Sequence, residues 1–151
     1  MAAGLSALRI EFLTDPVGIG YGSYVSNGNH NGLVRLINSV SANTGTAGSA
    51  ITVGNIFALG LQQAVVAAEY VALNQAQRDL WNAVITTAVT GISISNTVIR
   101  GQITTVWSAG TTTRTNLAAL QTRLCSRAET LFGEGIVVEP NEATKAVNGD
   151  F

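Results

Sequence analysis

Apolar side chains recur at helical spacing along most of the chain, beginning close to its first residues. Leu5, Leu8 and Phe12 stand at positions i, i+3 and i+7, so they share one face of a helix. Arg9 and Glu11 are expected to point away from that face. The pattern therefore predicts an amphipathic first helix that packs against other parts of the protein.

The first helix runs into the sequence TDPVGIGY, which has the composition of a rigid turn. Pro16 pushes the preceding Asp15 out of the α region, so the helix should end there. Gly18 and Gly20 can adopt positive φ at little cost, and Tyr21 adds a large ring with one polar tip. We expect this turn to pack rather than to react. It should hold the first helix against the body of the protein or a neighbouring subunit, with Tyr21 buried.

Further amphipathic segments predict more short helices, separated by loops rich in Gly, Thr and Asn. Residues 22–31 and 41–50 have loop composition, and the clearest helix begins after Asn74. Residues 92–94 and 103–106 contain β-branched side chains typical of strands, although their spacing favours helix. Ser and Thr at helix starts accept hydrogen bonds from unpaired backbone N–H groups. On that basis the other predicted N-caps are Thr52, Ser95 and either Thr112 or Thr113.

The C-terminal third contains one long apolar stripe from Leu117 to Phe132. Ser126 and Glu129 lie within it and match the capping box, in which each side chain binds the other residue's backbone N–H. Either the helix breaks after Cys125 and restarts, or Ser126 faces outward; the capping box favours the break. Pro140 suits the first position of a closing helix over residues 141–147.

These patterns predict an all-α fold, a compact bundle of about five to seven short helices. A chain of 151 residues is long enough to bury a substantial core in one domain. No internal repeat or long linker divides the sequence. We therefore expect a single helical domain over residues 1–151.

Charged residues are scarce in this chain. They make up 11% of the sequence, against about 25% in ordinary soluble domains, and the net charge is −1. The basic residues are dispersed, which argues against a nucleic-acid groove with many phosphate contacts. Residues 36–68 carry no charge, but polar side chains and glycines interrupt them, so a membrane span is not expected.

Groups suited to catalysis or metal binding are also few. His30 is the sole histidine and lies in an Asn/Gly-rich stretch with the composition of a surface loop, while Cys125 is the sole cysteine. A single cysteine cannot form an internal disulfide, which favours a reducing compartment. Zinc needs three or four ligands, and these two residues do not supply them. We expect a non-enzymatic protein with no cofactor and no metal; a hydrolase using Cys125 or His30 is the alternative.

The glycine-rich sequence GIGYG after Val17 does not fit a dinucleotide-binding loop. That fingerprint follows a strand, opens a helix and is followed by an acid about 20 residues later. Here a helix precedes the glycines, and the next acid is Glu69.

A possible docking surface lies near the C-terminal end of the chain. Arg123 and Arg127 stand four residues apart on one helix face, and Glu129 is close by. The alternative is that these charges form a solvated face.

Three segments, in this order, resemble a group of small, mostly α-helical structural proteins of tailed bacteriophages. They are TDPVGIGY from Thr14, AEYVALNQAQR from Ala68 and SRAETLFGEGIVV from Ser126. Residues 36–57 carry no recognisable similarity. The chain departs from the group after Tyr21, where the similar proteins continue into a polar helix start but this sequence looks like a loop.

The resemblance implies a virion component and no catalytic residue. The expected role is a multi-copy adaptor or connector at the head–tail neck or tail, located in the virion and assembled in the cytoplasm of the bacterial host. Its expected partners are portal, tail or capsid subunits and further copies of itself, with no small-molecule substrate, sequence-specific nucleic acid or membrane. The alternatives are a capsid decoration (cement) protein or a soluble assembly factor.

Overall fold

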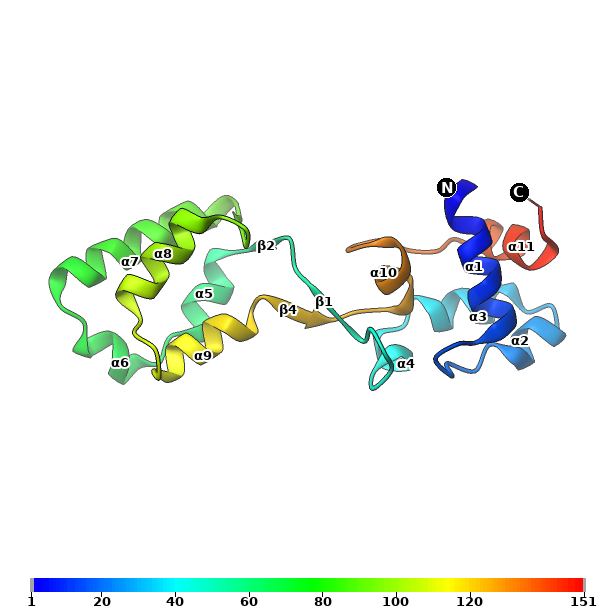
Figure 1. The fold of residues 1–151 in the computed structure, drawn as a ribbon, viewed down its shortest axis with the longest axis horizontal. Helices are drawn as coiled ribbons and strands as arrows, with labels where there is room; N and C mark the ends of the chain where they lie inside the picture. The colour runs from blue at the N-terminus through cyan, green and yellow to red at the C-terminus, as the bar shows by residue number, and fades with distance from the viewer. Residues whose placement is uncertain (1, 151) are drawn as a thin grey trace. The chain divides into compact units, whose positions relative to one another are not determined.

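The computed structural model describes residues 2–150, and helices dominate this part of the chain (Figure 1). It contains eleven α-helices, one 3-10 turn and four short strands, rather than the five to seven helices of the sequence-based expectation. The helices are α1 Ala2–Thr14, α2 Gly22–Ser26, α3 His30–Ile37, α4 Val40–Asn43, α5 Ala58–Ala64, α6 Ala67–Ala72, α7 Gln75–Thr87, α8 Thr97–Val106, α9 Thr112–Ala119, α10 Arg127–Phe132 and α11 Pro140–Asn148, with the 3-10 turn η1 at Ala88–Thr90.

Two pairs of short strands accompany the helices. Strands β1 (Ala50–Thr52) and β4 (Thr122–Leu124) form one two-stranded sheet, and β2 (Asn55–Ile56) pairs with β3 (Ile92–Ser93) in another. The second pair is antiparallel, with Asn55 opposite Ser93 and Ile56 opposite Ile92. The prediction of a purely helical fold was therefore wrong at these places, where β-branched residues outweigh the helical spacing.

The backbone divides into two compact units. Unit 1 combines residues 2–51 with residues 124–150, and unit 2 comprises Thr52–Arg123. The chain passes between the units within β1 and within β4. Because no change in composition marks these points, the sequence did not indicate the division. The sequence predicts a single domain. That the two units unfold together as one domain stays a prediction.

Unit 1 is built around the first and last helices of the chain. Leu8 and Phe12 of α1 are buried as expected, and α1 packs against α11. The prediction that Arg9 and Glu11 point away from the core was wrong: Arg9 donates to the carbonyls of Ala146 and Val147, and Glu11 is 2% exposed. Arg9 and Glu11 border the apolar stripe of α1, so their side chains can reach polar groups on a second helix. The buried core comprises Leu8, Phe12, Tyr21, Leu33, Ile37, Ala128, Val138, Ala143 and Ala146.

Unit 2 packs α5 to α9 around two tryptophans. The rings of Trp81 and Trp107 meet edge to face, with centroids 5.3 Å apart. Asn74 stands at the start of α7, as the pattern predicted, and it forms a complete capping box with Gln77 that was not predicted. The N-caps of α8 and α9 are Asn96 and Thr111, one residue from the predicted positions.

Three other sequence-based assignments need correction. Thr52 belongs to β1 and caps no helix; the nearest helix, α5, starts at Ala58. Residues 22–31 are not one loop, because they hold α2 and the start of α3. Ile92 and Ser93 form a strand, although their spacing favoured helix, whereas residues 103–106 are helical as their spacing predicted.

The long C-terminal apolar stripe is broken. Helix α9 ends at Ala119, β4 follows, and α10 restarts after the capping residue Ser126. The predicted break after Cys125 is therefore confirmed. Pro140 occupies the first turn of α11, also as predicted.

Candidate functional site

The turn after α1 is held by the side chain of Asp15. Its two carboxylate oxygens accept hydrogen bonds of 2.7 Å from the backbone N–H groups of Ile19 and Gly20. Asp15 itself has φ = +43°, and Gly18 and Gly20 have φ of +74° and +99°. Since side chains other than Asn and Asp rarely tolerate positive φ, the sequence of this turn fixes its shape.

Tyr21 closes the turn against the first helix. It is fully buried, as predicted, and its ring meets the ring of Phe12 edge to face, with centroids 5.2 Å apart. Its hydroxyl has no hydrogen-bond partner among residues 2–150. Burial raises the pKa of Tyr21 well above its ordinary value, and the nearby Glu11 carboxylate adds to that shift. The residue therefore serves as a packing group and stays protonated.

A buried ion pair joins α1 to α10. The guanidinium of Arg127 donates from Nε to Oε1 and from Nη2 to Oε2 of Glu11, each at 2.9 Å. The Arg127 and Glu11 side chains are only 10% and 2% exposed. Hydrogen bonding to Glu11 raises the pKa of Arg127 above its ordinary value, so the guanidinium stays charged. Sequence reasoning missed Glu11, although its position three residues after Leu8 places it beside the apolar stripe.

The capping box at Ser126 extends beyond its own helix. Glu129 accepts from the backbone N–H of Ser126 at 3.0 Å through Oε2, and from Gly135 N–H at 3.0 Å through Oε1. Glu129 is 9% exposed. One carboxylate therefore fixes both the start of α10 and the glycine turn that follows it.

The expected docking surface of Arg123, Arg127 and Glu129 does not form as one exposed patch. Arg123 lies in β4 and is exposed, whereas Arg127 and Glu129 are buried in the contacts just described. The helical spacing on which the expectation rested does not exist, because the chain is extended between α9 and α10. Pro16, the remaining residue of the predicted motif, is exposed beside the Asp15 turn.

Glu69 plays a similar part in unit 2. Its carboxylate oxygens accept from the backbone N–H groups of Thr112 and Thr113, each at 2.7 Å, at the first turn of α9. Hydrogen bonds from Thr113, and then from Thr112, hold the pKa of Glu69 below its ordinary value. The next residue, Tyr70, lies under the guanidinium of Arg78, 5.9 Å from its ring centroid. This role of Glu69 was not predicted, since its partners lie more than forty positions away.

Asp15, Glu69 and Glu129, which come from three separate segments of the chain, act in the same way. Asp15, Glu69 and Glu129 each bind two backbone N–H groups that no helix or sheet satisfies. Such charge-assisted hydrogen bonds are about twice as strong as neutral ones. The acidic residues of these segments are therefore occupied in fixing the backbone.

His30 and Cys125 have separate partners. His30 begins α3 and is half-buried rather than in a loop, with Nδ1 2.9 Å from the Thr144 hydroxyl. Cys125 is fully buried, and its Sγ contacts the Thr130 hydroxyl at 3.3 Å and the Gly48 carbonyl at 3.4 Å. These contacts do not place the thiol beside the imidazole.

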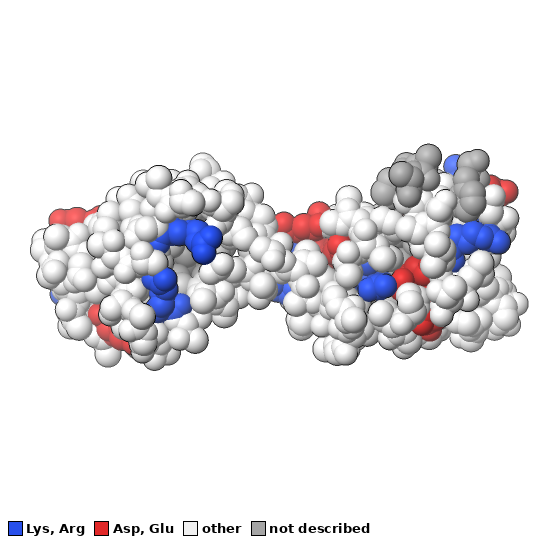
Figure 2. Space-filling view, viewed as in Figure 1, with Lys and Arg blue, Asp and Glu red and all other residues white. Residues whose placement is uncertain are grey.

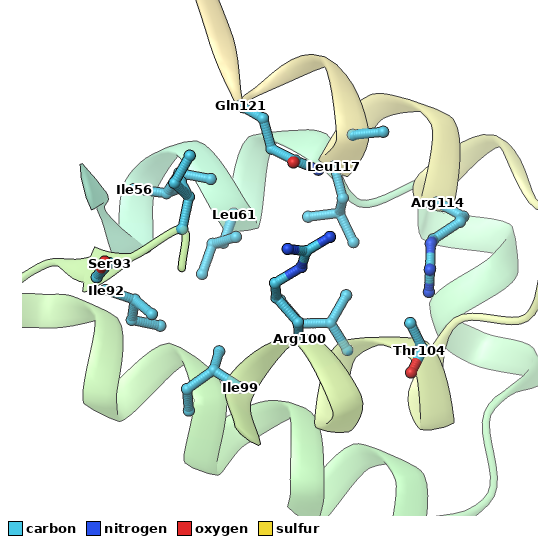
Figure 3. Close-up of a pocket in the computed structure, with 13 residues that line it drawn as sticks. Ile56, Leu61, Ile92, Ser93, Ile99, Arg100, Thr104, Arg114, Leu117 and Gln121 are labelled. Atoms are coloured by element: carbon cyan, nitrogen blue, oxygen red, sulfur yellow. The ribbon is translucent and has the colours of Figure 1, made fainter. Parts of the chain in front are cut away.

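Unit 2 contains a cavity of about 130 Å³ between α8 and α9 (Figure 3). Arg100 extends from α8 into its centre, and Arg114 lies at one side with Nη1 3.3 Å from the Trp107 carbonyl. None of the described residues that line it is acidic. Its apolar wall consists of Ile56, Leu61, Ile92, Ile99, Ile103 and Leu117.

Within residues 2–150, no three His, Cys, Asp or Glu side chains gather in a way that suits a metal ion. Over the same residues, every helix is too short or too polar to cross a bilayer.

Comparison with protein-family models, curated proteins and solved structures finds no match to this chain.

Proposed function

We propose that this protein is a non-enzymatic structural component of a tailed phage particle, present in many copies as an adaptor at the head–tail neck or tail. The observation that carries the proposal is that Asp15, Glu69 and Glu129 each bind two backbone N–H groups through one carboxylate. The acidic residues of these three segments hold the backbone in a particular shape, which suits a structural role. In that role the protein contacts portal, tail or capsid subunits and further copies of itself.

The surface favours the same role. The face in Figure 2 carries few charged side chains, in keeping with the 11% charged content of the chain. Ile10 and Leu13, one turn apart on α1, are 61% and 49% exposed, and Phe57 and Leu59 at the start of α5 are 55% and 65% exposed. Interface cores are depleted in charged residues and more apolar than the rest of a protein surface. Protein contact would cover these apolar pairs.

Quantitative mass spectrometry of purified virions tests the proposal. We expect the protein in every particle preparation, at a fixed ratio to the portal or tail subunits. A copy number that follows the major capsid protein would instead identify a decoration protein. Presence in infected cells but absence from mature particles would identify an assembly factor and overturn the adaptor role.

A further inference from the structure

We propose that the cavity between α8 and α9 of one copy receives Val137 and Glu139 of a second copy, with Arg100 binding the Glu139 carboxylate. The inference deepens the proposed multi-copy role by naming the two surfaces, but its test does not depend on the particle.

The cavity is suited to a carboxylate attached to an apolar group. Arg100 is exposed, and Figure 3 shows its guanidinium near the aliphatic side chains of Leu61 from α5 and Leu117 from α9. Among the described residues, this guanidinium has no hydrogen-bond or ion-pair partner. The guanidinium of an arginine offers planar donors to a carboxylate. The apolar wall beside it can pack against an apolar side chain near that carboxylate.

Unit 1 presents such a group in the segment before α11. Along residues 136–139 exposure alternates as in a strand: Val138 is buried, whereas Val137 and Glu139 are exposed. Residues two apart on an extended chain point the same way, about 7 Å apart. Of the large exposed apolar residues of unit 1, Val137 is the one followed two positions later by an exposed carboxylate. Leu13 stands two positions before Asp15, but that carboxylate is half-buried and occupied within its turn.

The segment is also held in place. The Asn38 side chain accepts from Val138 N–H at 2.9 Å and donates to the Val138 carbonyl at 2.8 Å, so it pairs with the backbone as a neighbouring strand would. Glu139 is the N-terminal residue of the α11 capping box. A carboxylate has enough acceptor sites to cap a helix and bind a guanidinium together. Because the segment is ordered before binding, association costs less conformational entropy.

The charges of the two units are complementary. Unit 2 carries four arginines and two acids, a net charge of +2, while the rest of the chain carries four basic and seven acidic residues, a net charge of −3. Attraction between unit 2 of one copy and unit 1 of another therefore favours the second copy as the occupant.

Sedimentation velocity of the full chain, with charge reversals on each side, tests the pairing. We expect reversible self-association that weakens with added salt. Arg100→Glu alone and Glu139→Arg alone should each weaken it by at least about tenfold, because each opposes like charges. An equimolar mixture of the two variants should associate again, since the mixture contains only complementary contacts between unlike copies.

Matched controls are Arg35→Glu and Asp150→Arg, which reverse exposed charges of unit 1 outside the proposed contact. Each should leave association within about twofold of wild type. Because Glu139→Arg also disturbs the α11 cap, Val137→Ser provides a second variant that leaves the capping carboxylate intact and should weaken association. Circular dichroism establishes that each variant is folded.

Three outcomes would overturn the inference. They are a wild-type monomer at concentrations up to about 1 mM, association that Arg100→Glu leaves unchanged, and a mixture that fails to associate although both variants are folded. A monomer found at fixed copy number in virions would reject this contact while leaving the adaptor role in place.

Discussion

Arg127 and Glu11, 116 positions apart in the sequence, face each other as a buried, doubly hydrogen-bonded ion pair with both N–O distances at 2.9 Å. This pair connects α1, which leads into the TDPVGIGY turn, to α10, which begins the SRAETLF segment. The pair therefore joins the first helix to the helix that follows Ser126 within unit 1.

Breaking this pair from one side should strongly destabilise unit 1. Arg127→Met leaves the Glu11 carboxylate buried without its partner, and we expect a loss of about 3 kcal/mol of unfolding free energy. Glu11→Leu combined with Arg127→Met should recover most of that loss, because no charge is then left buried. Urea unfolding of the single and double variants measures the coupling. If the loss of unfolding free energy in the double variant equals the sum of the losses in the two single variants, the predicted coupling is contradicted.

The buried hydroxyl of Tyr21 should make stability depend on alkaline pH. The pKa of Tyr21 is raised above its ordinary value of 10.0 in the folded protein, so the unfolded chain loses this proton first as the pH rises. Folding stability therefore falls above pH 10. Tyr21→Phe should match or exceed wild type by up to about 1 kcal/mol at pH 7, because it removes an unpartnered hydroxyl. Its advantage should grow above pH 10.

Thermal unfolding at a series of pH values measures this effect. Tyr24→Phe is the control, since it leaves Tyr21 in place and should keep the alkaline loss. A Tyr21→Phe profile parallel to wild type above pH 10 would refute the assignment.

Gly20 and Gly22 provide a matched test of the turn geometry. An added Cβ would meet open space at both positions, but only Gly20 has positive φ, at +99°. Gly20→Ala should therefore lose about 1–2 kcal/mol. Gly22→Ala, at the first residue of α2, should be neutral or stabilising by up to about 0.5 kcal/mol. Chemical denaturation of the two variants compares them, and equal effects would show that backbone conformation is not the cause.

Glu69 should stabilise the start of α9 in a pH-dependent way. Because its folded pKa is lowered from 4.5, the contribution is fully present above about pH 4.5 and is lost as the pH falls through the folded value. Glu69→Gln should melt below wild type at pH 7, and the two melting temperatures should converge in acid. Asp79→Asn, an exposed control whose side chain still accepts from Gln75, should show no such convergence. A gap that persists at low pH would point to packing instead of charge.

Local patterns in the sequence determined the elements whose signals lie within one helical turn. Five features could be predicted because each depends on residues only a few positions apart. They are the buried face of Leu8 and Phe12, the helix start at Asn74, the capping box at Ser126, the Pro140 helix start and the buried Tyr21. The TDPVGIGY turn likewise followed from the φ preferences of proline and glycine.

The tertiary structure decided what those elements contact. The sequence could not pair Glu11 with Arg127, direct Glu69 to α9, or place Arg100 in the cavity between α8 and α9, since each relation joins segments separated by long stretches of chain. The sequence also did not indicate the division into two units. That division depends on which segments contact each other in the fold and not on any change in composition. Helical periodicity specifies which face of a helix is apolar, but burial of a charged residue depends on whether folding brings an opposite charge within hydrogen-bond distance.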